Sequence, residues 1–322
     1  MMRLPDFYLV LKSDIEKIEH ELEKSVATEQ PVLNKAALHL LQAGGKRIRP
    51  IFVLLCAKFG AYDIEKVKHI ASALEMIHMG SLVHDDVIDD AELRRGRQTI
   101  KAKWDNRVAM YTGDFLFARA VEKASFLQNG EVHQILSKAM IDMCVGEIEQ
   151  IRDQFNWQQH LKTYLRRIKR KTALLIAVSC QLGALSADVP PSIQRQLYYY
   201  GYNVGMSFQI MDDVLDFIGT EEELGKPAGS DLLQGNITLP ALYAMQKDDE
   251  LKKEVIRLAN GDEVVSVRAI IEKVKTSGGI EYAKKLSKKY LDKAYDSLDG
   301  LPNRSAKKSL VTIASYIGKR TY

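Results

Sequence analysis

Apolar residues recur at helical spacing along almost the whole of this 322-residue chain. Val67, Ile70, Leu74 and Ile77, for example, follow one another at steps of 3, 4 and 3 residues, which places them on one face of a helix. No segment shows a convincing alternation of apolar and polar residues, the pattern of a half-buried strand. The 8 prolines are few for a chain of this length, so helices can run long. The sequence therefore predicts an all-α fold built as a single large helical bundle.

Glycines and prolines divide this pattern into about ten predicted helices. The breaks lie at Gly44–Gly45, Gly60, Gly96, Gly130, Pro190–Pro191, Gly225–Gly229, Gly261, Gly278–Gly279 and Gly300–Pro302. None of them is a long flexible linker, so we expect one domain over residues 1–322. Residues 248–301 are more charged and less regular, and we expect them to form peripheral helices.

Composition excludes several classes of protein. Hydrophobic residues make up 46% and charged residues 27%, which is typical of a globular protein and excludes intrinsic disorder. The net charge of +4 gives no argument for a nucleic-acid partner. The apolar stretches fall far short of the roughly 20 residues of a membrane span, and Asp6, Asp14 and Glu16 make the N-terminus unlike a secretory signal. We therefore expect a cytoplasmic protein with buried, reduced thiols. These thiols are Cys56, Cys144 and Cys180.

Two helical segments carry the same acidic pattern. Residues 85–89 read DDVID and residues 212–216 read DDVLD. The first and last aspartates of each motif lie about 40° apart around the helix and one turn apart along it, so their carboxylates leave the same face. Gln209 lies one turn before Asp213, near the same face of the second segment. Gly201 and Gly205, four residues apart, would let a neighbouring helix approach that segment closely.

The duplication favours a metal site over a simple helix end. A single motif of this kind is explained most simply by solvated carboxylates that cap a helix. Two copies embedded in apolar sequence place like charges close together in partly buried surroundings, which is costly unless the charge is compensated. Hard divalent cations relieve this repulsion, and Mg²⁺ completes its shell with water and substrate phosphate. The two motifs therefore predict Mg²⁺ and a phosphorylated ligand.

Clusters of cations accompany the acidic motifs. Residues 44–50 read GGKRIRP, residues 94–97 read RRGR, and Lys171 and Lys226 lie on either side of the second motif. Each cluster taken alone is explained most simply by a solvated basic surface. Nucleic acid is a poor alternative, because the cations alternate with acidic motifs and lack interleaved aromatic residues. Two acidic faces with several basic groups suit two diphosphates, one held through Mg²⁺ and one held directly by Arg and Lys.

Together these residues resemble the trans-polyprenyl diphosphate synthases, all-α enzymes of the isoprenoid synthase type with a central active-site cavity. Two DDxxD motifs combined with GGKRIRP form a specific signature, and the similarity spans nearly the whole chain. Residues 235–240 (GNITLP), 300–302 (GLP) and 316–320 (YIGKR) are most similar to the catalytic large subunits, component II, of bacterial two-component heptaprenyl diphosphate synthases. The chain departs from the family at Asn236, where many relatives carry a Lys that helps to hold the allylic diphosphate.

The resemblance implies a role for individual residues. Those expected to bind isopentenyl diphosphate are Lys46, Arg49, His78 and Arg95. Those expected to bind the allylic diphosphate are Arg94, Lys171, Thr172, Gln209 and Lys226. The expected metal-binding cluster is Asp85, Asp86, Asp89, Asp212, Asp213 and Asp216, and the expected catalytic set is Asp85, Asp89, Arg94, Lys171 and Asp212. Gly80 and Ser81, just before the first motif, would shape the floor of the channel that sets the product length.

Two of these residues also have simpler interpretations. A lone histidine on an apolar helix is usually a core residue, but His78 lies seven residues before Asp85 and hence only about 20° away around the helix. Gly80 could serve only to let two helices pack, because a glycine inside a helix costs about 1 kcal/mol relative to alanine and needs a reason.

The resemblance implies a trans-prenyltransferase that condenses isopentenyl diphosphate with an allylic diphosphate, farnesyl diphosphate being the expected primer. Heptaprenyl diphosphate for the menaquinone side chain is the expected product, made with a smaller non-catalytic subunit (component I) in a heterodimer, alongside possible self-association. Membrane contact would be at most peripheral, for product release. The alternatives are a homo-oligomeric synthase of another chain length and a catalytically silent scaffold subunit. A metal phosphohydrolase built on His84-Asp85 and a class I terpene cyclase fit the motifs less well.

Overall fold

The computed structural model describes residues 6–94, 96–220, 228–262 and 265–319. Nearly all regular structure in this part of the chain is helical, which confirms the predicted all-α fold. There are more helices than the roughly ten expected from glycine and proline positions, because several helices end at residues other than these breakers. Among the described residues, no helix combines the length and apolarity that a membrane span needs.

The chain divides into two compact units. The first comprises residues 1–140, 175–198 and 300–312, and the second comprises residues 141–174, 199–299 and 313–322. Boundaries fall inside four helices, α7 (Gly130–Asp153), α9 (Leu174–Leu185), α10 (Pro191–Ile218) and α17 (Ser305–Gly318). A single domain over residues 1–322 therefore stays a prediction.

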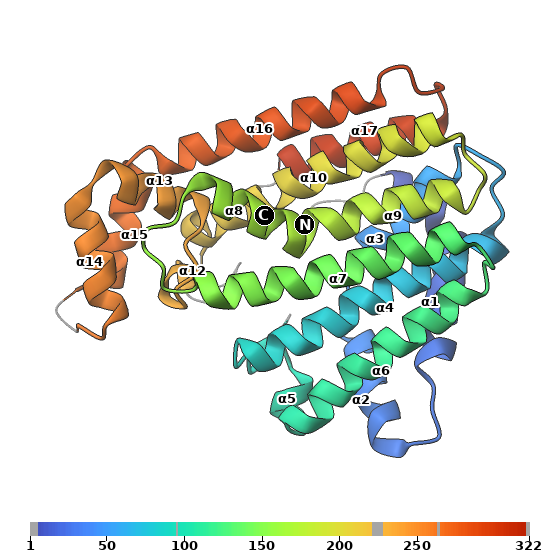
Figure 1. The fold of residues 1–322 in the computed structure, drawn as a ribbon, viewed down its shortest axis with the longest axis horizontal. Coiled ribbons are helices and arrows are strands. Elements are labelled where there is room, and N and C mark those ends of the chain that lie inside the picture. The colour runs from blue at the N-terminus through green and yellow to red at the C-terminus, as the bar shows by residue number, and fades with distance from the viewer. Residues whose placement is uncertain (1–5, 95, 221–227, 263–264, 320–322) are drawn as a thin grey trace. The chain divides into compact units, whose positions relative to one another are not determined.

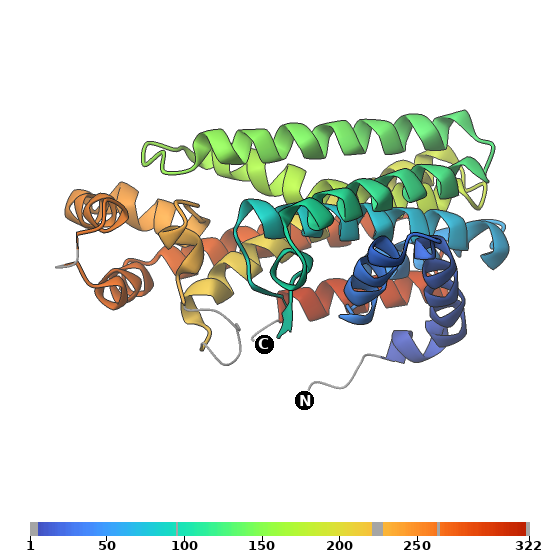
Figure 2. The ribbon, with the colours of Figure 1, turned by 90° about the horizontal axis from the view of Figure 1, so that it is seen from below.

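The first unit is built around α4, which carries the first acidic motif. Helix α4 spans Ile64–Ile88, and the other elements are α1 (Asp6–Val26), α2 (Pro31–Gln42), α3 (Ile48–Ala57), β1 (Leu93–Arg94), β2 (Arg97–Gln98), α5 (Ile100–Lys103), α6 (Asn106–Ser125) and most of α9 (Leu174–Leu185). The Asp63 side chain accepts a hydrogen bond from the Glu65 backbone N–H and so caps the start of α4. Helices α1, α3 and α6 lie beside α4 (Figures 1 and 2).

A short hairpin follows α4 and was not predicted. Strands β1 and β2 pair antiparallel, with Arg94 opposite Arg97, and Gly96 takes a φ of 74°. Strands of two residues are too short to produce the alternating pattern by which strands are found in a sequence. The hairpin is the element that returns Arg94 to the acidic motif.

The second unit is built around the rest of α10. Its other elements are α8 (Leu161–Ile168), the π-helix η1 (Lys169–Ala173), α12 (Ser230–Leu233), α13 (Leu239–Lys247), α14 (Asp249–Ala259), α15 (Val267–Thr276) and α16 (Gly279–Leu298). Helices α13, α14 and α15 gather at one end of α16 (Figure 1). The expectation that residues 248–301 are peripheral is wrong in part, because Leu251, Val274 and Ala283 are buried in the same core as Phe217 of α10. Their amphipathic helices expose many charges but still bury one apolar stripe.

One of the three cysteines is not buried as expected. Cys56 and Cys180 are buried, whereas Cys144 is exposed on α7. Its apolar neighbours Ile141 and Ile148 are also exposed, so apolar sequence around a thiol did not imply burial here.

Candidate active site

The first acidic motif occupies the last turn of α4, and its three aspartates have different surroundings. Asp86 is only 2% exposed, whereas Asp85 is half-buried and Asp89, the C-cap of the helix, is exposed. The Arg94 side chain from β1 donates from Nε and places Nη2 at the same Asp86 Oδ1, both at 2.7 Å. Burial raises the pKa of Asp86, and the charge of Arg94 opposes that rise. Asp85 and Asp89 are therefore the more accessible carboxylates of this motif. Asp86 is paired with the Arg94 guanidinium.

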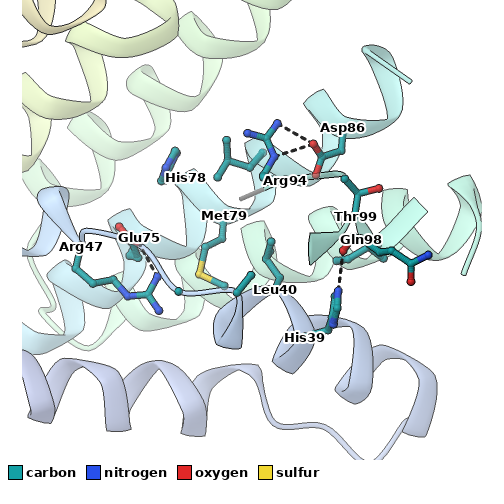
Figure 3. Close-up of a pocket in the computed structure, with 14 residues that line it drawn as sticks. His39, Leu40, Arg47, Glu75, His78, Met79, Asp86, Arg94, Gln98 and Thr99 are labelled. Carbon is teal, nitrogen blue, oxygen red and sulfur yellow. Dashed lines mark hydrogen bonds and ion pairs between the residues drawn. The ribbon is translucent and has the colours of Figure 1, made fainter. Parts of the chain in front are cut away.

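A pocket in the first unit brings several predicted site residues together. Figure 3 shows His78, Asp86 and Arg94 among its lining side chains, with Asp86 and Arg94 paired. Arg47 and Glu75 line the same pocket. His78, on α4, is therefore placed at a cavity wall rather than sealed inside the core, as its ligand interpretation requires.

The GGKRIRP loop turns one of its three cations inward. Arg47 is buried and takes a φ of 44° at the start of α3. Its Nη2 donates to Glu19 Oε2 at 3.1 Å, and its Nη1 donates to Glu75 Oε1 at 3.1 Å. Burial lowers the pKa of Arg47, but the hydrogen bonds and charges of these two glutamates outweigh it and raise the pKa overall. Lys46 is exposed and Arg49 is half-buried, so the two cations expected to bind isopentenyl diphosphate stay accessible.

Helices α4 and α6 meet at His84 and two glycines. The His84 Nε2 lies 3.1 Å from the Met110 carbonyl oxygen, and a methyl group at Gly113 would lie 2.2 Å from the same nitrogen. A methyl group at Gly80 would lie 3.1 Å from the Gly113 carbonyl oxygen. Gly80 therefore packs against α6, while Ser81 is half-buried and donates to the His78 carbonyl oxygen. Their role in product length stays a prediction.

The second acidic motif is held by a chain of hydrogen bonds. Asp213 is 3% exposed and accepts from the Tyr164 hydroxyl at 2.7 Å and from Gln209 Nε2 at 2.9 Å. The Thr172 hydroxyl donates to Gln209 Oε1 at 2.6 Å. Burial raises the pKa of Asp213 to about 7, against the lowering effect of both hydrogen bonds. The structure thus joins three predicted site residues, Thr172, Gln209 and Asp213, in one hydrogen-bonded chain that ends at Tyr164, which the sequence did not single out.

The other two aspartates of this motif differ in exposure. Asp212 is half-buried, whereas Asp216 is 2% exposed, with Ser230 Oγ at 3.3 Å from its Oδ1. The Asp216 carbonyl oxygen also accepts from the Gly229 backbone N–H at 2.9 Å. Asp212 is therefore the most accessible carboxylate of the second motif.

Lys171 and Thr172 lie in the π-helix η1, a feature that the sequence did not reveal. Single π turns inside helices are rare and often mark functional sites. A methyl group at Gly205 would lie 2.5 Å from the Ala173 Cα, so this glycine admits the π turn, which confirms the close approach predicted for it. Lys171 is exposed, and its Nζ donates to Gln150 Oε1 at 3.2 Å.

Three further positions complete the comparison with the sequence. Arg95 and Lys226, expected to bind the isopentenyl and allylic diphosphates, lie outside the described residues. Asn236 is half-buried, and its backbone N–H donates to the Asp231 carbonyl oxygen at 2.8 Å.

The donor chemistry fits a hard divalent cation shared with a substrate. Within residues 6–94, 96–220, 228–262 and 265–319, no cluster of three or more His, Cys, Asp or Glu side chains is arranged to hold a metal alone. In the first motif the accessible donors are the carboxylate oxygens of Asp85 and Asp89, and in the second motif they are those of Asp212, with no histidine nitrogen among the predicted ligands. Mg²⁺ prefers oxygen donors and takes several ligands from water and phosphate, so an incomplete set of protein ligands is what it needs.

Comparison with known proteins identifies the family. Residues 30–274 match the polyprenyl synthetase family. The chain belongs to this family. It is therefore a trans-prenyltransferase, as the motifs and the resemblance predicted, and this enzyme class replaces the phosphohydrolase alternative.

Several relatives match over most or all of their length. The chain is 59% identical over 321 residues to heptaprenyl diphosphate synthase component 2 of Geobacillus stearothermophilus, covering 100% of both chains. It is 56% identical to the protein of the same name in Bacillus subtilis, covering 100% of this chain and 92% of that one. The crystal structure of heptaprenyl diphosphate synthase from Staphylococcus aureus superposes with a TM-score of 0.93 at 44% identity, covering 97% and 99% of the two chains.

A more distant structure holds ligands. Polyprenyl synthase from Caulobacter crescentus, solved in complex with calcium and isoprenyl diphosphate, superposes with a TM-score of 0.92 at 31% identity and covers 98% and 97% of the two chains. The isoprenoid synthase type of fold predicted for this chain is thereby confirmed.

Proposed function

We propose that this chain is the catalytic subunit of a two-component synthase that makes heptaprenyl diphosphate from isopentenyl diphosphate and farnesyl diphosphate. The observation that carries the proposal is a pair of DDxxD motifs, each with at least one accessible carboxylate, in a chain that matches heptaprenyl synthase component 2 from end to end. Seven isoprene units is the length implied by those relatives, and the menaquinone side chain is the use that we propose for it.

The two substrates would bind to different residues. Lys46, Arg49 and His78 would bind isopentenyl diphosphate, since two are accessible cations and the third lines the pocket of the first unit. Arg94, Lys171 and Thr172 would bind the allylic diphosphate. Arg94 would stabilise negative charge as the diphosphate leaves the allylic carbon, and the isopentenyl double bond would then form the new carbon–carbon bond with loss of a proton.

Asp85, Asp89 and Asp212 would hold Mg²⁺. When bound, Mg²⁺ would neutralise the diphosphate and favour its departure as a leaving group. Asp86, Asp213 and Asp216 are engaged by protein donors, so we propose that they support the metal-binding aspartates rather than bind the metal first. We further propose that the enzyme works in the cytoplasm and touches the membrane only peripherally to release product.

Product analysis tests the proposal. The purified chain would be assayed alone and together with the small non-catalytic subunit from the same organism, and the products sized by chromatography. We expect weak activity alone and a seven-unit product from the heterodimer. Full activity from the single chain would favour a homo-oligomeric long-chain synthase. Absence of Mg²⁺-dependent turnover in both samples would favour a catalytically silent scaffold.

A further inference from the structure

Tyr164 is a fully buried polar side chain for which the proposed mechanism has no use. It is 0% exposed and belongs to the core of the second unit, together with Val214 and Phe217. Its hydroxyl donates to Asp213 at 2.7 Å. A buried carboxylate is costly unless donors satisfy it, so this hydroxyl stabilises Asp213 in place.

Asp213 in turn decides which way the Gln209 amide points. When Asp213 is ionised its carboxylate accepts hydrogen bonds and donates none, so the Gln209 amide nitrogen faces Asp213 and the amide oxygen faces away. That oxygen accepts from the Thr172 hydroxyl at 2.6 Å. Three consecutive hydrogen bonds therefore lead from the core tyrosine to the π turn.

The π turn is the segment that presents Lys171. Thr172 and Ala173 contact α10 through Gln209 and Gly205, whereas Lys171 extends to Gln150 of α7. Anchoring Thr172 thus fixes the backbone from which Lys171 reaches its ligand.

We propose that Tyr164 is a positioning residue for the allylic diphosphate. It acts through Asp213 and Gln209 to hold Thr172, and so sets the place of Lys171. This inference rests on the proposed function, because it assigns Lys171 and Thr172 to the allylic substrate. Asp213 then acts as the hydrogen-bond acceptor that connects Tyr164 to Gln209.

Binding of a non-reactive allylic analogue provides the first test. Calorimetry with farnesyl thiodiphosphate and Mg²⁺ would be run on the wild-type chain, on Tyr164→Phe and on Tyr202→Phe. Tyr202 packs against the same core without belonging to the hydrogen-bonded chain, so its variant makes the same chemical change outside the path. We expect the dissociation constant to rise about tenfold in Tyr164→Phe, the size of one lost hydrogen bond, and to stay unchanged in Tyr202→Phe. Unchanged binding in Tyr164→Phe, or equal weakening in both variants, would overturn the inference.

The KM values of the heterodimer give a second test, because a purely structural role of Tyr164 would not change the KM of one substrate selectively. In Tyr164→Phe the KM for farnesyl diphosphate should rise while the KM for isopentenyl diphosphate stays within twofold. Asp213→Asn should behave likewise, with no change in the Mg²⁺ concentration needed for half-maximal rate. A large increase in that Mg²⁺ concentration would show that Asp213 is a metal ligand and would refute its anchoring role.

Variants at Thr172 test the same path further, and Asp213→Asn, which leaves Tyr164 intact, keeps the inference testable if Tyr164→Phe folds poorly. Thr172→Ala would weaken analogue binding, Thr172→Ser would retain it, and Tyr164→Phe combined with Thr172→Ala would add little to Thr172→Ala alone. Additive effects would exclude a shared path. A wild-type chain that binds the analogue but makes no product contradicts the proposed function only, whereas binding that ignores Tyr164 contradicts only this inference.

Discussion

The two DDxxD motifs have nearly the same sequence, yet the two units use them differently. In both, the second aspartate faces inward and is held by protein donors. In the first motif that donor is a cation, Arg94, whose side chain is 32% exposed. In the second motif the donors are neutral, Tyr164 and Gln209, and are buried or half-buried. A charged partner near solvent is available to a substrate, whereas a neutral buried partner can only support the structure.

The position at which each helix ends explains a second difference between the two motifs. Helix α4 ends at Ile88, so the last aspartate of its motif caps the helix and is exposed. Helix α10 continues to Ile218, so Asp216 stays within the helix and is buried. The first motif therefore offers two accessible carboxylates and the second offers one. The same DDxxD pattern yields different sites because the helix ends within the motif in one case and continues beyond it in the other.

The largest expected effect is the removal of an accessible carboxylate from either motif. Asp85→Ala and Asp212→Ala should each lower turnover by about three orders of magnitude, because each removes a proposed ligand of the ion that acts on the leaving diphosphate. Turnover at saturating Mg²⁺ would be compared with the wild type, and circular dichroism would check folding. Near-normal turnover in either variant would remove that motif from the metal site.

Replacing the second aspartate of each motif with asparagine should reduce activity more in the first motif, where the partner is charged, than in the second, where the partners are neutral. Asp86→Asn leaves Arg94 without its anionic partner, and kcat/KM for the allylic substrate should fall roughly 100-fold. Asp213→Asn leaves neutral partners and should cost only about tenfold. Steady-state kinetics of both variants side by side measures the difference. Equal losses would mean that the charge of Arg94 does not distinguish the motifs.

Removing one cation from each unit should separate the two substrates. Lys46→Ala or Arg49→Ala should raise the KM for isopentenyl diphosphate about tenfold with little change for the allylic primer, because a charge-assisted contact to one ligand is lost. Lys171→Ala should give the reverse pattern. Varying each substrate at saturating levels of the other decides the assignment, and a reversed result would exchange the two sites.

We expect the smallest effect on catalysis from substitutions at Gly80 and Ser81, just before the first motif. Ser81→Phe should shorten the product while leaving the first condensation largely intact, because the ring fills space that the tail would occupy. For Gly80→Phe we expect an effect on stability, because Gly80 packs against α6. It should lower the free energy of unfolding by about 1–3 kcal/mol through overpacking.

Chromatography of the products and thermal unfolding would be measured for both variants, with Gly80→Ala as the matched control for the second. Full-length product from a folded Ser81→Phe would place the channel floor elsewhere. Normal stability of Gly80→Phe would contradict the packing role of that glycine.

Much of this architecture and site could be predicted from sequence because the signals are local. Helical periodicity predicts the all-α fold, and the spacing within each motif places the first and last aspartates on one face whatever surrounds the helix. The cations at residues 44–50 and 94–97 were identified for the same reason. The pattern did not distinguish Arg47 from Lys46 and Arg49, because all three carry the same charge and only Glu19 and Glu75, distant in sequence, turn one of them inward.

The sequence by itself determined the helices, the two matched acidic motifs, the diphosphate chemistry that they suit, and the family. Tertiary structure alone decided which aspartates are accessible, that Arg94 returns to Asp86 on a hairpin, and that Tyr164 reaches Asp213 across 49 residues of chain. Helical spacing is a property of neighbouring residues and can be read along the chain. Burial and hydrogen-bond partners depend on residues that meet only after folding, and the free energy of a buried carboxylate depends on those partners.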